Sequence, residues 1–364
     1  MPTKKSTAKK SEAVGWGIIG CGVIGPYHAS SIKDTSAAQL VACCDVIPER
    51  ARKLAQGYGP GIKAYATIDE LLADPAVQAV SICTPSGMHA EHVVAAAEAG
   101  KHILCEKPLD ITLCAIDTAI AAAKANNVKL AGVFQRRTYP SSKRVREAVR
   151  SGKLGKLVLG DAYQKYFRSH DYYASGAWRA TWELDGGGCL MNQGVHGIDL
   201  LLYLMGPIKR LSAYARRLVR NIAVEDTAVA IVEFENGAVG VIEGTTSVTP
   251  GYDCKIEISG DNGTIVLHGD NIEHWDIPGE EGQAEGSAEG KGTAADPTAG
   301  LSNTGHVHHV EDLCAAIKED REPEIPGSEA RRAVEVIKAI YLSSREGGCS
   351  IELPLGYEDD GPGI

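Results

Sequence analysis

Two segments of the chain carry side chains that can act on an oxygen atom. The first is Glu106-Lys107-Pro108, which directly follows a short apolar run. A lysine in a cleft can polarise a hydroxyl or carbonyl oxygen, and burial readily lowers its pKa. The second is Asn192, followed four residues later by His196, and histidine can take up a proton at neutral pH. Lys107 and His196 therefore predict acid–base work of the kind that hydride transfer from a carbinol needs.

The histidine lies in a distinctive stretch of sequence. Trp178 and Arg179 precede a run of three glycines, and Asn192, His196 and Asp199 follow at spacings of four and three. That spacing places the last three on one face of a helix, which we expect over residues 189–204. Two plainer interpretations stay open, namely a hydrogen-bonded core histidine and a Lys107 that pairs with its neighbouring glutamate for packing.

A glycine motif near the start predicts a dinucleotide site. The segment Gly20-Cys-Gly22-Val23-Ile24-Gly25 follows an apolar run and opens a helical pattern, and Asp45 comes twenty residues later. The glycines allow a tight turn, close approach of a pyrophosphate and close packing of helix on strand. Asp45 would bind the adenosine ribose and repel a 2′-phosphate, which favours NAD. NADP is the less favoured alternative, because the nearby Arg50 could bind a phosphate.

The elements around these motifs predict where they meet. Up to residue 135, short apolar runs alternate with helical patterns, which is typical of βαβ units and a parallel sheet. Strands are expected over 14–20, 39–45, 63–66, 77–83, 102–105 and 129–134. Cys83-Thr84-Pro85 and Glu106-Lys107-Pro108 then end two of these strands, on the same sheet edge as the glycine loop.

The sequence pattern changes after residue 150, because turn sequences typical of β-hairpins appear there. They are Asn236-Gly237 and Gly260-Asp261-Asn262-Gly263. They predict a largely antiparallel sheet with strands over 156–167, 209–220, 227–235, 238–248, 253–259 and 263–268. A pair of helices is expected at 307–320 and 328–345. The predicted fold class is α/β, with a doubly wound parallel sheet over 14–135 and an α+β domain over 136–350. A basic tail (1–13) and a C-terminal tail (351–364) flank them.

Composition narrows the class of protein. The net charge of −10, much of it from an acidic low-complexity loop at 278–300, argues against nucleic acid or an anionic membrane as a partner. No apolar run reaches the length of a membrane span, and the N-terminal lysines lack the apolar stretch of a secretory signal. Ten scattered cysteines without a C-x-x-C pair indicate reduced thiols and a cytoplasmic protein.

Taken together, the glycine loop, the Glu-Lys-Pro tripeptide and the Gly-Gly-Gly…Asn-x-x-x-His segment resemble the Gfo/Idh/MocA oxidoreductases. The resemblance covers roughly residues 14–350. It implies a Rossmann domain followed by a domain with an open sheet, whose outer face commonly forms homodimers or homotetramers. It also implies NAD as cofactor and a small carbohydrate as substrate.

The resemblance assigns roles to individual residues. Lys107 would be the catalytic or substrate-anchoring lysine, preceding a cis peptide at Pro108, and His196 the acid–base group. Arg179 and Asn192 would join them in binding the substrate. Beside the glycine loop (Gly20, Gly22, Val23, Ile24, Gly25), Asp45 and Arg50, the residues expected to line the cofactor are Thr84, Pro85, His89, Glu106, Lys107, Gln135, Trp178 and Arg179.

One position departs from the family pattern. Many sugar dehydrogenases of this group have aspartate where this chain has Asn192. An amide orients hydroxyls but cannot share a proton or raise the pKa of His196 as a carboxylate does. Asn variants look common in the uronate-type branches, so the departure counts against an inositol-type substrate more than against activity.

The sequence predicts a hydride transfer between NAD and a secondary alcohol of a sugar or sugar derivative. Two alternatives remain at this level. One is a redox-neutral enzyme whose tightly held NAD oxidises the substrate transiently, for elimination or epimerisation. The other is a cofactor-sensing regulator without turnover, against which an intact Lys107 and His196 speak.

Two further clusters are open to more than one interpretation. His306, His308 and His309 lack nearby cysteines or paired acids in sequence, so no metal site is predicted there. A basic patch follows the sixth strand. We expect it to be a solvated helix face, and the less favoured alternative is an anion-binding site. Its members are Arg136, Arg137, Lys143, Arg144 and Arg146.

Overall fold

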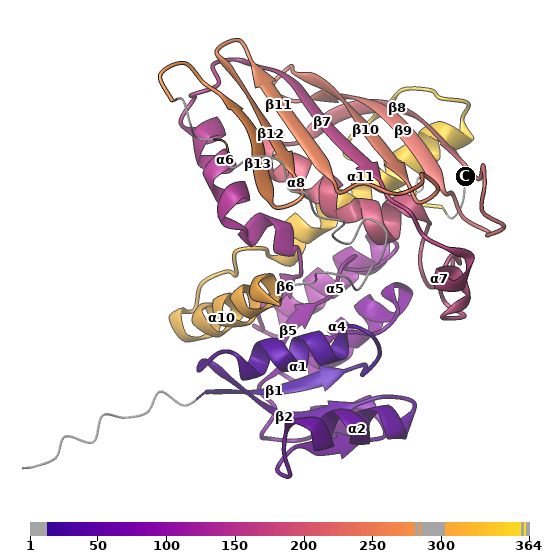
Figure 1. Ribbon diagram of the computed structural model, residues 1–364. Coiled ribbons are helices and arrows are strands. Elements are labelled where there is room, and N and C mark those ends of the chain that lie inside the picture. Colours follow the sequence, from indigo (N-terminus) through magenta and orange to yellow (C-terminus); the bar gives the residue numbers. More distant parts are fainter. Residues whose placement is uncertain (1–12, 281–283, 285–302, 358–359, 362–364) are drawn as a thin grey trace, which may run out of the picture.

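The structure is a computed structural model that describes residues 13–280, 284, 303–357 and 360–361. The chain forms two sheets, with helices between them (Figure 1). The expected tail over 1–13 and the acidic loop over 278–300 lie almost wholly outside the described residues.

The first sheet is parallel and has six strands in the order β3-β2-β1-β4-β5-β6. Every residue of β1 and β4 is buried, as expected for strands covered by helices on both faces. The chain adds β2 and β3 on one side of β1 and then crosses to add β4, β5 and β6 on the other side. The strand order therefore reverses between β1 and β4, which is where doubly wound folds bind ligands. The strands are β1 Val14–Ile19, β2 Ala38–Cys44, β3 Lys63–Tyr65, β4 Ala79–Ile82, β5 His102–Cys105 and β6 Leu130–Gly132.

Local signals start the helices of this half. Pro26 stands in the first turn of α1, Thr67 and Glu70 form a capping box on α3, and Thr112 caps α5. The helices are α1 Gly25–Lys33, α2 Pro48–Tyr58, α3 Ile68–Leu72, α4 His89–Glu98 and α5 Leu113–Ala125, with 3₁₀ turns η1 Ser86–Met88 and η2 Gln135–Thr138. This half confirms the predicted doubly wound parallel sheet.

The second sheet has eight strands in the order β13-β12-β11-β7-β10-β9-β8-β14. All its pairings are antiparallel except that of β7 with β10, so the predicted, largely antiparallel sheet is confirmed. The strands are β7 Leu157–Lys165, β8 Ile208–Arg216, β9 Thr227–Phe234, β10 Val239–Thr245, β11 Lys255–Gly260, β12 Gly263–His268, β13 Asn271–Asp276 and β14 Ile351–Glu352.

Two of these strands differ from the sequence prediction. β13 was not expected, because a β-bulge interrupts its period of two, so that its buried residues Ile272 and Trp275 are three positions apart. β14 lies where the C-terminal tail was expected to begin: Ile351 pairs with Leu211 of β8 and is buried. The segment 351–364 is therefore not entirely a tail.

The helices of the second half include one irregular element. They are α6 Pro140–Arg150, α7 His170–Ala174, η3 Cys189–Gly194, α8 Val195–Met205, α10 Thr304–Glu319 and α11 Gly327–Arg345. The single helix expected over 189–204 begins as a π-helical turn, η3, before α8 continues it. Helices α8 and α11 pack together beneath the large sheet (Figure 1).

Helix α10 packs against the parallel-sheet half, although it comes late in the chain. Val310, Leu313 and Cys314 are buried in the same apolar cluster as β1 and α1 residues such as Trp16 and Ile32. Figure 1 shows α10 alongside this half. The Rossmann core is thus completed by a helix from the segment predicted to form the second domain. No described helix is long and apolar enough to span a bilayer.

Candidate active site

The glycine loop has the conformation that its residue types predict. Gly20 has a φ of +94°, and a Cβ there would lie 2.7 Å from the carbonyl oxygen of Cys83. Above Gly22, by contrast, a Cβ would meet no heavy atom within 4 Å. The loop therefore needs glycine at its turn and leaves open space at the point where a pyrophosphate would approach.

Asp45 lies at the end of β2 and is buried. Its Oδ2 accepts a hydrogen bond from the backbone N–H of Cys21 at 2.8 Å, and its Oδ1 accepts one from Ile47 at 2.8 Å. A carboxylate has further lone pairs, so it can still accept from ribose hydroxyls. Asp45 thus anchors the glycine loop, and its contact with the adenosine ribose remains a prediction. Three further residues around this loop are exposed to solvent: Arg50 in α2, Val23 in the glycine loop, and Val46 directly after Asp45.

The end of β4 is joined to the Glu-Lys-Pro segment by His89. Its Nε2 lies 2.8 Å from the carbonyl oxygen of Thr84, and its Nδ1 lies 2.7 Å from that of Pro108. Thr84 also bonds His92 through its hydroxyl at 3.0 Å. Both ring nitrogens of His89 are therefore occupied by the protein, so His89 holds two loops together, and its contact with the cofactor remains a prediction.

Lys107 follows β5 and precedes a cis peptide bond to Pro108, as the resemblance implied. Its Nζ donates to the carbonyl oxygen of Asn192 at 3.1 Å, and its backbone N–H donates to Glu106 Oε2 at 3.1 Å. Burial lowers the pKa of Lys107, and the charges of Glu106 and Asp185 offset only part of this effect. The structure therefore brings Lys107 against the Asn192–His196 segment, eighty-five residues away.

His196 lies in the first turn of α8, edge-on to Phe134 at a ring-centroid distance of 6.2 Å. Its Nδ1 is buried and has no hydrogen-bond partner among the described residues. Burial is the main reason why the pKa of His196 lies well below its usual range, and the positive charges of Lys107 and Arg136 lower this pKa further. His196 is thus neutral at pH 7 and can accept a proton.

Asn192 is oriented by a carboxylate that the sequence reasoning missed. Its Nδ2 donates to Asp185 Oδ1 at 2.7 Å, and Asp185 Oδ2 accepts from the N–H of Ala180 at 2.8 Å. Burial raises the pKa of Asp185. The run Asp185-Gly-Gly-Gly was visible in the sequence, but nothing local showed that the acid turns back onto the amide.

The predicted common face of Asn192, His196 and Asp199 is wrong for its last member. Asp199 instead forms a bidentate ion pair with Arg137, at 2.6 and 2.8 Å, and both side chains are buried. The π-helical turn that carries Asn192 changes the angular phase before α8 begins. The candidate site therefore consists of Lys107, Asn192 and His196, and Asp199 is paired elsewhere.

Arg179 and Trp178 reach this site through an aromatic side chain. Arg179 Nη1 donates to the Tyr172 hydroxyl at 2.7 Å, and its guanidinium lies over the rings of Tyr172 and Trp178, at 4.3 and 4.6 Å. The Tyr172 hydroxyl lies 3.4 Å from Asn192 Oδ1. Arg168 also approaches the Tyr172 ring, at 5.5 Å. Tyr172 and Arg168 were missed because they lie in a segment without a recognisable motif.

A buried glutamate, Glu225, accepts hydrogen bonds from backbone N–H groups at the start of the π-helical turn. Glu225 Oε2 accepts from the N–H of Gly188 at 2.8 Å, and Oε1 accepts from the N–H of Leu190 at 3.0 Å and from the Tyr341 hydroxyl at 2.8 Å. Burial raises the pKa of Glu225 to about 7. These bonds explain how the glycine run stays ordered, and no sequence signal indicated them.

Gln135 follows β6, and its Oε1 is buried with no partner among the described residues.

The basic patch after this strand is not the solvated helix face first expected: Arg137 is buried against Asp199, and Arg144 stacks over Trp275 at 4.5 Å. Lys143 alone of these fits that expectation, since it is exposed and pairs with Glu324 at 3.8 Å.

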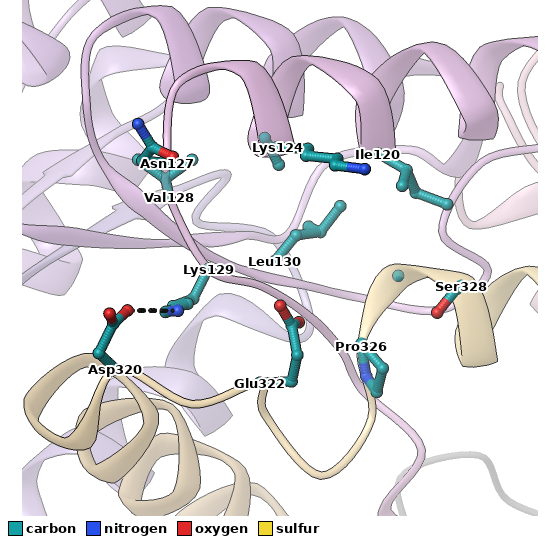
Figure 2. Close-up of a pocket in the computed structure, with 12 residues that line it drawn as sticks. Ile120, Lys124, Asn127, Val128, Lys129, Leu130, Asp320, Glu322, Pro326 and Ser328 are labelled. Carbon is teal, nitrogen blue, oxygen red and sulfur yellow. Dashed lines mark hydrogen bonds and ion pairs between the residues drawn. The ribbon is translucent and has the colours of Figure 1, made fainter.

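A cavity of about 390 Å³ lies away from this site, between α5, β6 and the turn before α11 (Figure 2). It is at the opposite edge of the parallel sheet, because Asn127 and Lys129 precede β6 whereas the site residues follow the strands. Figure 2 shows the ion pair of Lys129 with Asp320 at its rim. None of the predicted site residues lines it.

Two family models match the chain in succession. The oxidoreductase family model with an NAD-binding Rossmann fold matches residues 14–134, and the GFO/IDH/MocA C-terminal domain model matches residues 142–266. A myo-inositol 2-dehydrogenase of Thermotoga maritima is 34% identical over 265 residues, 70% of this chain and 75% of the relative. The chain belongs to the Gfo/Idh/MocA family. It is an NAD-binding oxidoreductase with the two-part architecture described above.

Further relatives cover the chain almost completely. An inositol 2-dehydrogenase of Rhizobium meliloti is 26% identical over 92% of this chain and 97% of its own length. Among solved structures, the WlbA dehydrogenase of Bordetella pertussis, in complex with NADH and UDP-GlcNAcA, has a TM-score of 0.85 at 29% identity. It covers 95% of this chain and 100% of the other. These relatives are named as dehydrogenases, which favours net hydride transfer over the redox-neutral and regulatory alternatives.

Proposed function

We propose that this family member oxidises a secondary alcohol of an acidic sugar derivative, or reduces the matching ketone, with Lys107 and His196 at the reacting oxygen. The observation that carries the proposal is the meeting of Lys107 Nζ with the Asn192 carbonyl, beside a neutral His196. A lysine cation and a neutral histidine are the pair that a hydroxyl needs in order to lose its proton.

The residues present fit NAD. The loop at Gly22 leaves open space for the pyrophosphate, Asp45 keeps acceptor capacity for the ribose, and Gln135 Oε1 is a buried acceptor without a partner. Bound NAD supplies the hydride acceptor, and the protein supplies binding, orientation and charge. The cofactor contacts of Thr84, Pro85, Glu106, Trp178 and Arg179 are part of this proposal.

The side chains divide the proton work as follows. Lys107 donates a hydrogen bond to the substrate oxygen and stabilises its negative charge. His196 takes the hydroxyl proton at Nε2, since Nδ1 is buried. Asn192, fixed by Asp185, orients a neighbouring hydroxyl. The carbinol C–H electrons leave as hydride and the O–H proton goes to His196, so the carbonyl product is balanced.

The charge around the pocket favours a substrate with an anionic group. Arg168 and Arg179 both approach the ring of Tyr172, whose hydroxyl lies beside Asn192. Within the part of the chain that the structure describes, Arg179 forms no ion pair. Guanidinium groups bind carboxylates and phosphates in bidentate geometry. UDP-GlcNAcA, the ligand named with the WlbA dehydrogenase, is of this kind.

A substrate panel tests the proposal. Matched pairs, such as a uronic acid and its parent sugar, with inositols and UDP-linked sugars, are assayed for NADH formation at pH 7. We expect turnover, with a higher kcat/KM for the acidic member of a pair. Turnover that is confined to neutral inositols would overturn the proposal that the substrate carries an anionic group. Bound NADH without turnover on any polyol or sugar would overturn the function itself.

Cofactor preference provides a separate prediction. The Asp45 carboxylate should repel the 2′-phosphate of NADP, so wild type should prefer NAD in kcat/KM. Asp45→Ser should narrow that preference by about tenfold, a change of roughly 1.4 kcal/mol. Because Asp45 also bonds Cys21, the variant should lose some NAD affinity as well. A wild type that uses NADP tenfold better would contradict this role of Asp45.

We also propose that the outer face of the large sheet joins copies of this chain into a homodimer or homotetramer. The face opposite α8 and α11 exposes apolar side chains on neighbouring strands, among them Val229 and Ile231, which are 43% and 65% exposed. Alternate residues of β9 point to this face. Apolar side chains gathered on one sheet face are typical of an interface between subunits.

Ile231→Lys should shift the protein from an oligomer towards the 38.5 kDa monomer in light scattering. A lysine at the centre of an apolar interface would be buried without a partner, which is costly. Leu218→Lys, at an exposed loop position, is the control and should leave the mass unchanged. A monomeric wild type would contradict the proposal.

We propose a cytoplasmic location. All ten cysteines are free, and eight of them are buried. Buried, unpaired thiols are typical of proteins in reducing compartments. The redox state of the thiols in protein isolated from the native source tests this point.

A further inference from the structure

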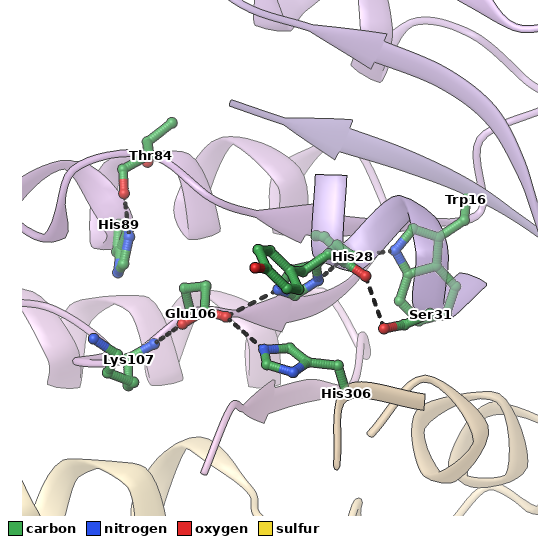
Figure 3. Close-up of polar contacts among 10 residues, drawn as sticks. Trp16, His28, Ser31, Thr84, His89, Glu106, Lys107 and His306 are labelled. Atoms are coloured by element: carbon green, nitrogen blue, oxygen red, sulfur yellow. Dashed lines mark hydrogen bonds and ion pairs between the residues drawn. The ribbon is translucent and has the colours of Figure 1, made fainter. Parts of the chain in front are cut away.

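The carboxylate of Glu106 is the meeting point of three segments of the chain. Its Oε1 lies 3.0 Å from His28 Nε2 and 3.2 Å from His306 Nε2, and its Oε2 accepts from the backbone N–H of Lys107 at 3.1 Å (Figure 3). The three acidic and imidazole side chains are buried. One carboxylate therefore connects α1 and α10 to the backbone of the catalytic lysine.

The donor directions at His28 follow from its other partners. Trp16 Nε1 can only donate, and it bonds the Ser81 hydroxyl oxygen at 2.9 Å. Ser81 lies 2.9 Å from His28 Nδ1, and burial lowers the pKa of His28. A neutral His28 that accepts from Ser81 at Nδ1 carries its hydrogen on Nε2. It therefore donates to Glu106.

Glu106 is an acceptor for all these partners. Although burial acts to raise its pKa, the hydrogen bonds from His28 and His306 outweigh burial and hold the pKa well below the usual range. Its ionised oxygens then need donors, and the backbone N–H of Lys107 supplies another. The rigidity of the β5 end depends on these donors being in place.

His306 comes from a helix that only the tertiary structure brings here. It lies in the first turn of α10, two hundred residues from Glu106. The start of α10 is fixed to α1 through Asn303, whose Nδ2 donates to Asp34 at 2.6 Å and to Ser30 at 3.2 Å. His306 Nδ1 has no partner among the described residues, which suits an unprotonated nitrogen while Nε2 donates.

The same three side chains could be considered as a metal site, since their ligand atoms lie within 4.8 Å of one another. A metal would need the Nε2 lone pairs of both histidines. In the tautomer inferred above, His28 Nε2 carries a hydrogen that points to Glu106, and the backbone N–H of Lys107 donates to the same carboxylate. The contacts are therefore those of a hydrogen-bond network.

We propose that His306 is a positioning residue for catalysis, which acts through Glu106 to hold the backbone of Lys107 in place. The proposal rests on the function proposed above for Lys107. It means that α10 must pack on the parallel-sheet half before the lysine is correctly placed. Loss of the His306 donor should loosen the β5 end and let water reach Lys107.

The test compares three substitutions. His306→Phe keeps an aromatic ring and removes the donor, and His306→Gln keeps a donor of similar reach. His308→Gln is a control at a half-buried position on the same helix, whose ring bonds Glu324 at 2.8 Å and does not contact Glu106. We expect kcat to fall about tenfold in His306→Phe, because small displacements of catalytic groups have effects of this size. His306→Gln should recover most of kcat. Should the Phe variant not fold, His306→Asn, whose amide is too short, replaces it.

A second readout does not need turnover. The pKa of Lys107 can be measured from the pH dependence of its acetylation by acetic anhydride, followed by mass spectrometry. In His306→Phe this pKa should rise towards the ordinary lysine value, and in His306→Gln it should stay low. An unchanged Lys107 pKa in His306→Phe would overturn the proposal even if no sugar is turned over. Stoichiometric zinc in wild type that is lost in His306→Gln would overturn it in favour of a metal site.

Discussion

Replacing His196 with alanine, or Lys107 with methionine, is expected to lower kcat by about 100-fold or more, a loss of roughly 3 kcal/mol of transition-state stabilisation. In the proposed reaction both side chains act on the oxygen whose charge changes during hydride transfer, so their effect should appear in kcat. The affinity for NADH, measured by fluorescence, should change little. A His196→Ala enzyme with near wild-type kcat would exclude this residue as the acid–base group.

The pH profile provides a check on the same residue. Because the pKa of His196 is held well below its usual range, its basic form persists as the pH falls below the usual range of histidine. The kcat/KM of wild type should therefore stay high under mildly acidic conditions and decline only below that lowered pKa.

Asn192→Asp is the matched comparison. It would place a second carboxyl group against Asp185, and the two should share one proton. The single negative charge of the pair is then divided between residues 185 and 192, which brings part of it to the residue one helical turn before His196. The pKa of His196 should then rise and move the acidic limb of the kcat/KM profile to higher pH. An unmoved limb would show that another group controls it.

Arg137→Met is expected to destabilise the protein by about 3–5 kcal/mol, because it leaves Asp199 as a buried charge without its partner. Arg137 forms the bidentate pair with Asp199 of α8 and also bonds Glu329 of α11 at 3.3 Å. The three contacts join the end of the parallel sheet to both helices beneath the large sheet. Denaturant unfolding of the purified protein measures the loss.

Two variants control this prediction. Arg150→Met, at an exposed position on α6, should cost less than about 0.5 kcal/mol. The double variant Arg137→Met/Asp199→Asn should be less destabilised than Arg137→Met alone, since the buried charge is gone. Equal losses for Arg137→Met and Arg150→Met would show that the buried pair contributes nothing special.

The sequence by itself determined the parallel-sheet half and the cofactor loop. Apolar runs of strand length, the three glycines and Asp45 are local features, and each fixes the conformation of a few consecutive residues. The ends of parallel strands then meet at one edge whatever the loops do. For this reason Lys107 could be placed on the same sheet edge as the glycine loop without coordinates.

The tertiary structure alone decided which polar groups are partners. Asp185 turns onto Asn192, Glu225 holds the glycine run, and Asp199 pairs with Arg137 and leaves the site. Each pairing joins a buried group to whichever partner packing brings within hydrogen-bond distance. No period or motif in a single chain encodes that choice.

The same reason explains His306. In sequence it belongs to a histidine cluster without obvious partners, but the packing of α10 on α1 carries it to Glu106 at 3.2 Å. Local patterns determine which helices and strands form, because they depend on neighbouring residues. The burial of charge is settled only when those elements dock, since desolvation makes an unpaired group costly.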